Sequence, residues 1–262
     1  MHTPAAQQNT NEILSLILDA LQSGEVLDEM SKYRFLREAD NQVMLERGLT
    51  LKALTHTAAH ERELAKKFAL EGLKYISDPA TLSNCLKVLQ INGYSKTLLE
   101  HVNLCLNYFD QADYITCFGS VIVSFPNVLH ASLIIKNLEK MELVEQHRDL
   151  YMCCTHITNT AEEAAKRFSL DKGVYSALSN VVANIAERNA VVINEAEMTI
   201  PPESDWVSLV YFVESEDIDK LVDMNFQLVD DVIDAELDTK PVVVRFEPLT
   251  PSSTTIVGNY AR

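Results

Sequence analysis

The sequence predicts a mainly α-helical protein that ends in a small acidic α+β domain. Proline is scarce through the first three-quarters of the chain, where Pro79 and Pro126 alone interrupt the stretch between Ala5 and Ile200. Leu, Ala, Glu and Lys are abundant there, and apolar residues recur at helical spacing. From Ala190 onward the pattern changes to short runs rich in β-branched and aromatic residues. The change predicts a domain boundary at this point.

We expect residues 1–11 to be flexible and residues 12–189 to form the helical domain. A capping-box pattern at Asn9 and Glu12 predicts a first helix through Leu21, which Ser23-Gly24 ends. The next two helices are expected over Val26–Arg47, with Gly48 as the C-cap, and over Leu49–Ile76.

Asp78 is a natural N-cap and Pro79 a first-turn residue for the fourth helix, and Ser95 caps the fifth. Further helices are predicted near 111–123, 126–140 and 142–154, then from a capping box at Thr160–Glu163 to Ser169, and from Asp171 to Arg188. The helices are compatible with an irregular bundle or with a short stack. The residues expected in the core are Leu14, Ile17, Leu86, Leu89, Val102, Leu106, Leu133, Leu178 and Val182.

Residues 190–247 are predicted to form the α+β domain. The strand-like segments are 190–193, 206–213, 226–237 and 241–246, with a linker over 195–205 and a short helix over 215–225. This order, β-α-β-β with an additional first strand at 190–193, is typical of a small sheet packed on one helix. Residues 248–262 are expected to form an extended tail.

The negative charge is concentrated in the same region. From Glu195 to Glu247 there are 15 acidic and three basic residues, a local net charge of −12, whereas the whole chain carries −16. Such acidity disfavours binding to nucleic acid and to anionic membranes, because both are negatively charged. It is compatible with basic protein partners, with divalent cations, and with a face that is only solvated.

The cysteines indicate a reducing compartment. Five are present, with no CxxC spacing, and the adjacent pair Cys153–Cys154 has poor geometry for a mutual disulfide. No signal peptide or apolar run long enough to span a bilayer is visible. We therefore expect a cytoplasmic protein, or a component of a particle assembled in the cytoplasm, and we also consider a phage or other mobile-element origin.

His56, His60 and Glu63 are the best candidates for metal ligands. On one continuous helix, positions i, i+4 and i+7 share a face, and imidazole and carboxylate are suitable ligands for zinc or iron. The segment does not match the HExxH pattern of metalloproteases. The interpretation we favour is a helix face with incidental histidines, and we predict no metal and no cofactor.

No catalytic residue is predicted. Cys154 and His156 are two positions apart and would face different ways on a helix. Glycine-rich phosphate loops, GxSxG elbows and aromatic-basic strips for nucleic acid are absent from the sequence. The residues predicted to bind a partner are the lone tryptophan, four acidic residues and one residue of the tail: Trp206, Asp217, Asp230, Asp231, Asp234 and Tyr260. The alternative role of the tryptophan is core packing.

The function we favour is that of a non-catalytic structural or protein–protein interaction protein. It would be part of a larger assembly, through self-association or a protein partner with a basic surface, and would make contacts through its acidic domain and tail. One alternative is a metal-dependent enzyme with a divergent site at His56, His60 and Glu63. The other is an acidic inhibitor that mimics nucleic acid.

Overall fold

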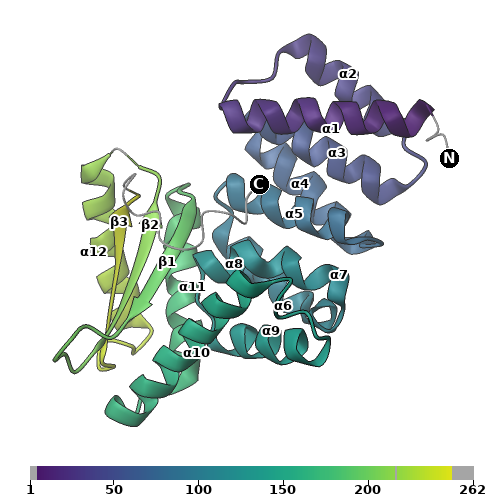
Figure 1. Cartoon of the computed structure of the whole chain (residues 1–262). Coiled ribbons are helices and arrows are strands. Elements are labelled where there is room, and N and C mark those ends of the chain that lie inside the picture. The colour runs from purple at the N-terminus through teal and green to yellow at the C-terminus, as the bar shows by residue number, and fades with distance from the viewer. Residues whose placement is uncertain (1–4, 216, 250–262) are drawn as a thin grey trace. The chain divides into compact units, whose positions relative to one another are not determined.

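The computed structural model describes residues 5–215 and 217–249, with side chains from residue 12 onward. The described chain is mainly helical, with a small sheet near its C-terminal end, which confirms the predicted fold class (Figure 1). It divides into two compact units, Met1–Asn92 and Gly93–Arg262. The boundary expected at residue 190 falls inside the second unit, and the tail expected over 248–262 lies almost entirely outside the described residues.

The first unit is built around one buried helix. Its helices are α1 (Ala5–Ser23), α2 (Glu29–Asp40), α3 (Leu45–Ala58), α4 (Arg62–Gly72) and α5 (Pro79–Ile91). Helix α3 packs against the other four, and eleven of its 14 residues are buried (Figure 1). A helix that is buried all round is usually apolar all round, yet α3 contains several polar residues.

Several polar side chains of α3 have hydrogen-bond partners, most of them within the helix. The hydroxyls of Thr50, Thr55 and Thr57 each donate to the main-chain carbonyl four residues earlier, at 2.7–2.9 Å. The carboxylate of Glu46 accepts a hydrogen bond from Ser77 at 2.5 Å, which holds its pKa below the usual range. These bonds remove most of the cost of burying polar groups.

Gly48 allows α2 and α3 to pack closely. A methyl group on its Cα would lie 2.7 Å from the main-chain oxygen of Ala39 in α2. The prediction that Gly48 ends a helix over 26–47 is therefore wrong. That segment is α2, which Asp28 caps by accepting from the Ser31 amide at 3.0 Å, followed by a turn and the first residues of α3.

The prediction of one helix over 49–76 is also wrong, because this stretch contains the end of α3 and all of α4. His60 adopts a left-handed conformation at φ 56°, and the amide of Glu61 donates to the carbonyl of His56 at 2.8 Å. The His60 amide donates to Thr57 in the same turn. This is the Schellman geometry that glycine usually provides, so the sequence carries no conspicuous signal for the break.

The second unit places a small sheet beside a group of helices. Its helices are α6 (Ser95–Leu104), α7 (Ala112–Ile115), α8 (Gly119–Ser124), α9 (Val128–Lys140), α10 (Arg148–Phe168), α11 (Lys172–Arg188) and α12 (Ile218–Asp234). Short 3-10 turns at 106–110 and 116–118 join α6, α7 and α8. Thr160 lies inside α10, so the helix start predicted there is wrong, whereas Asp171 caps α11 as predicted.

The sheet has the order β1-β2-β3, formed by β1 (Ile193–Thr199), β2 (Val207–Val213) and β3 (Val242–Pro248). The central strand β2 pairs with β1 antiparallel and with β3 parallel. Six of the seven residues of β2 are buried, which suits a strand covered on both faces. Helix α12 connects β2 to β3 and packs on β3 and α11 (Figure 1).

Three predictions for this region are corrected by the structure. The linker expected over 195–205 contains most of β1, and the strand expected over 190–193 reaches the sheet only at its last residue. The strand expected over 226–237 does not form, because this segment continues the preceding helix as α12. The predicted strands over 206–213 and 241–246 are confirmed as β2 and β3.

Long-range polar contacts join the helices to each other and to the sheet. The N-terminus of α6 lacks a side-chain cap of its own, but the Glu187 carboxylate of α11 accepts from both the amide and the hydroxyl of Thr97 at 2.9 Å. A carboxylate at a helix N-terminus is favourable for the helix dipole. The ring of His156 in α10 bonds the carbonyl of Met198 in β1 at 2.8 Å.

Most of the predicted core is buried. Leu14 is half-buried instead, while Leu106 and Leu133 are each 36% exposed. The predicted core residues that are buried are Ile17, Leu86, Leu89, Val102, Leu178 and Val182.

Substituting Gly48 by alanine should destabilise the first unit. The added methyl group would meet main-chain atoms of α2, and such overpacking costs about 1–3 kcal/mol. This exceeds the gain of up to about 1 kcal/mol in helix propensity. Urea unfolding followed by circular dichroism measures the change. Gly119→Ala is the control, since its methyl group would meet only Leu150 at 3.8 Å and should be neutral or stabilising. Equal stability of the two variants would contradict the close packing of α2 and α3.

A buried histidine should make the second unit sensitive to acid. His130 lies 3.1 Å from the side-chain oxygen of Asn103, and burial lowers its pKa to about 4. The unfolded chain then binds a proton at higher pH than the folded chain. The contribution of neutral His130 to the free energy of unfolding is therefore complete above pH 6.5. This contribution falls by about 3 kcal/mol as the pH drops to 4. His130→Gln should remove this part of the pH dependence in urea unfolding, and unchanged pH dependence would contradict the assignment.

Candidate functional site

The structure does not bring the three metal-ligand candidates onto one face. His56 lies in the last turn of α3 and is buried, whereas His60 is exposed in the left-handed turn that follows. Glu63 is exposed in the first turn of α4. Residues at i, i+4 and i+7 share a face only on one continuous helix, and α3 ends at Ala58. Within residues 5–215 and 217–249, no three His, Cys, Asp or Glu side chains are grouped so that they could hold a metal ion.

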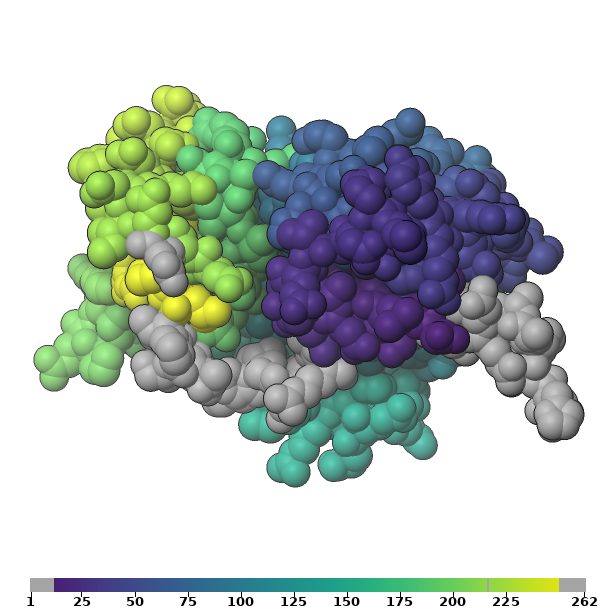
Figure 2. Space-filling model, turned by 90° about the horizontal axis from the view of Figure 1, so that it is seen from above, coloured from purple at the N-terminus to yellow at the C-terminus, as the bar shows by residue number. Residues whose placement is uncertain are grey.

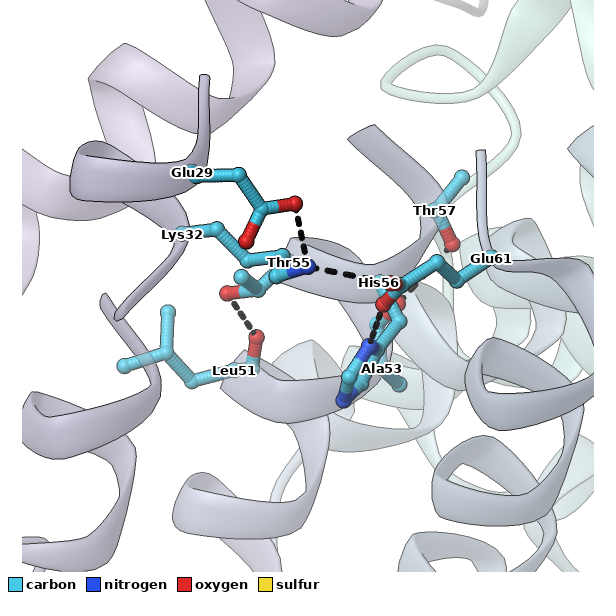
Figure 3. Close-up of polar contacts among 8 residues, drawn as sticks. All are labelled: Glu29, Lys32, Leu51, Ala53, Thr55, His56, Thr57 and Glu61. Atoms are coloured by element: carbon cyan, nitrogen blue, oxygen red, sulfur yellow. Dashed lines mark hydrogen bonds and ion pairs between the residues drawn. The ribbon is translucent and has the colours of Figure 1, made fainter. Parts of the chain in front are cut away.

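His56 belongs instead to a charged network that links α2, α3 and the start of α4 (Figure 3). Its Nδ1 atom lies 2.5 Å from one carboxylate oxygen of Glu61. The other oxygen of Glu61 accepts from the Lys32 ammonium at 3.0 Å, and Lys32 also donates to Glu29 at 2.8 Å. The His56 ring is stacked on Phe68, with the ring centroids 5.3 Å apart.

The network keeps Glu61 and Lys32 ionised. The hydrogen bond from His56, and then that from Lys32, lowers the pKa of Glu61. Hydrogen bonds to Glu29 and then to Glu61 raise the pKa of Lys32 to about 12. An ionised carboxylate with both oxygens occupied and a permanently charged ammonium do not exchange protons near neutral pH. The arrangement therefore acts as a cross-link between helices.

The cysteines of α10 are unsuited to nucleophilic chemistry. Burial raises the pKa of Cys153 to about 11 and raises that of Cys154 further. Both side chains are thiols at neutral pH, and the thiolate is the reactive form. His156, the nearest histidine in sequence, has one ring nitrogen bound to the main chain of β1.

The residues predicted to bind a partner lie in different surroundings. Asp217 is the N-cap of α12 and accepts from the Lys220 amide at 3.0 Å. Asp231 is paired with Arg188 of α11 at 2.7 Å, and Trp206 is half-buried immediately before β2. Asp230 and Asp234 are exposed on α12. The remaining candidate, Tyr260, lies outside the described residues.

Helix α12 exposes a row of large apolar side chains that the sequence analysis missed. Their exposed fractions range from 46% at Val222 to 71% at Ile218. The spacing of four, four, three and four residues places all of them on one face of the helix. We call this row the α12 stripe; it consists of Ile218, Val222, Phe226, Val229 and Ile233.

A row of carboxylates runs alongside the α12 stripe. Four of the five stripe residues are followed directly by an exposed aspartate, and one residue corresponds to a rotation of about 100° around a helix. The two rows are therefore parallel and adjacent. We call the second the aspartate row; it consists of Asp219, Asp223, Asp230 and Asp234.

The opposite face of α12 fixes the helix in the unit. Leu221, Met224 and Leu228 are buried. The side-chain amide of Asn225 donates to the main-chain carbonyl of Phe246 at 3.0 Å and accepts from its amide at 2.9 Å. The orientation of α12 is thus determined by its own contacts, so the stripe is held outward. Figure 2 shows residues of α12, in yellow-green, at the surface next to the yellow residues of β3.

The sequence contained a signal for this face. If helical spacing is continued through residue 234, the apolar residues fall into two rows, one on each side of the helix. The stretch 226–237 was interpreted as a strand because Phe, Val and Ile favour strands. The absence of glycine and proline between residues 218 and 234 would have supported a single helix.

Comparisons with protein-family models, with curated proteins and with solved structures gave no match to this chain. A separate search of the described helices found none with the length and apolar character required to cross a bilayer.

Replacing Glu61 with glutamine should lower the melting temperature. The amide is uncharged and has a single acceptor oxygen, so it cannot accept from both Lys32 and His56. A broken, partly buried network costs more than a surface pair. Thermal unfolding of the full chain measures the effect. The matched control is Glu71→Gln, whose partner Lys74 is exposed, and it should change the melting temperature little. A control as destabilised as Glu61→Gln would argue against a special role for the network.

Proposed function

We propose that this protein is a non-catalytic interaction protein that joins a larger assembly by docking another protein on α12. The observation that supports this function is the α12 stripe, in which five large apolar side chains are exposed on one rigid helix face. Soluble proteins rarely leave such groups contiguous and open to water unless they serve a contact.

The energetics favour a contact at this place. Burial of apolar surface contributes about 25 cal/mol per Å², and a row of Ile, Val and Phe offers more apolar surface than isolated exposed residues do. Large aromatic side chains are frequent anchors at protein interfaces. Phe226 is 67% exposed at the middle of the stripe, so it is the natural anchor residue.

The stripe also favours protein docking over nucleic-acid mimicry. A mimic presents carboxylates in place of phosphates and needs no apolar surface between them. Here the aspartate row lies beside a continuous apolar row, which is the arrangement of an interface with an apolar centre and a charged rim.

Association of the full-length protein in its own cells tests the proposal. Tagged wild-type protein, Phe226→Asp and Leu129→Asp would be purified after mild cross-linking, and the captured proteins quantified. Leu129 is a matched control because it is 56% exposed on a different helix, α9. We expect Phe226→Asp to lose at least about 90% of a specific partner that wild type and Leu129→Asp retain, since a buried charge costs several kcal/mol.

Circular dichroism would first verify that the three proteins are equally folded. A wild-type protein that captures no partner and remains a monomer would contradict the proposed function. Retention of all partners by Phe226→Asp would contradict it as well, because the contact would then lie elsewhere.

A further inference from the structure

We propose that the outer face of α12 receives a basic amphipathic helix of a partner protein. The apolar side of the partner helix would pack on the α12 stripe, and its Lys and Arg side chains would pair with the aspartate row. This inference rests on the proposed function and specifies the chemistry of the partner.

The shape of the surface favours a helix as the ligand. The α12 stripe extends from Ile218 to Ile233 along a regular helix, 15 steps of 1.5 Å or about 22 Å. A straight apolar row of this length matches the apolar face of a partner helix of about four turns. Successive contacts at intervals of three and four residues are typical of paired helices.

Strand addition at the neighbouring sheet edge is the main alternative geometry, and it is opposed by a specific contact. β3 is an edge strand, and an exposed edge can accept a further strand. The amide of Asn225 already occupies both main-chain hydrogen-bonding groups of Phe246, near the end of β3. A new strand would have to break both bonds, whereas a helix on the stripe leaves them intact.

The charge of α12 favours a basic ligand. Residues 218–234 contain five aspartates and one lysine, a net charge of −4. Asp231 is paired with Arg188, but the structure gives the four carboxylates of the aspartate row no ion-pair partner within the described residues. Long Lys and Arg side chains can cover the edge of an apolar contact while their charged ends reach carboxylates beside it.

The same charge disfavours a second copy of this chain as the ligand. Pairing two α12 helices would bring together two surfaces of net charge −4, and like charges at an interface are destabilising. A helix that carries a basic row beside its apolar row would be attracted to the aspartate row, whereas a second α12 would be repelled by it. Electrostatic attraction would also speed association and make it dependent on salt.

A designed peptide provides a direct test with the full-length protein. The probe is a fluorescent helix of about 21 residues, three heptads, with leucine on one face and lysine beside it. Its acidic twin has glutamate in place of each lysine, and a third peptide has the lysine composition in scrambled order. Fluorescence anisotropy at low and high salt measures binding of each peptide.

We expect the basic helix to bind at least about tenfold more tightly than its acidic twin or the scrambled peptide, with affinity falling as salt rises. Phe226→Asp should weaken binding about tenfold or more. Conversion of the whole aspartate row to asparagine should weaken binding and flatten its salt dependence. The matched control converts four exposed carboxylates elsewhere in the unit, with the same change in net charge, and should leave binding unchanged: Glu100, Asp110, Asp113 and Glu145.

Any of the following results would overturn this inference. The acidic and basic helices could bind equally, the control could weaken binding as much as the aspartate-row variant, or light scattering could show an α12-dependent dimer that excludes the peptide. If the basic peptide does not bind while Phe226→Asp still loses its cellular partner, the partner has different chemistry and the proposed function stands. If neither assay depends on α12, both proposals are wrong.

Discussion

The fold depends on the requirement that polar groups buried between helices find hydrogen-bond partners. In the first unit this requirement is met inside α3, whose threonine hydroxyls bond its own carbonyl groups, and at Glu61, which joins α2 to α3. In the second unit Glu187 supplies the cap that α6 lacks, and Asn225 holds the edge strand. The contacts at Glu61, Glu187 and Asn225 each join elements that are separate in sequence.

Helix α12 departs from the usual division between a buried apolar face and a polar exposed face. Its inner row, which includes Leu221, Met224 and Leu228, packs in the unit, while its outer row remains in water. An exposed apolar row adds nothing to the stability of the isolated chain and increases the risk of aggregation. A rigid scaffold that holds such a row outward is what a docking surface requires, because little order is then lost on binding.

The acidic residues near the C-terminal end have different structural roles. Asp217 caps a helix and Asp231 neutralises Arg188, so part of the charge serves the fold. Among the described residues the aspartate row has no ion-pair partner, and it lies beside the α12 stripe. The net charge of a region therefore says little about partners until the carboxylates that serve the fold are separated from those that face solvent.

The sequence by itself determined the fold class, most helix starts that carry Asp or Pro signals, and the strands β2 and β3. These features depend on local chemistry, such as the N-caps at Asp78 and Asp171, and on runs of β-branched residues. Only the tertiary structure decided that His60 ends a helix without glycine and that Gly48 serves close packing. Each of these depends on which neighbouring segment covers the residue, and that is set by contacts between parts of the chain far apart in sequence. For the same reason the spacing of His56, His60 and Glu63 did not predict their positions. The apolar spacing of the α12 stripe was present in the sequence, but it became a surface only when the sheet covered the other face of the helix.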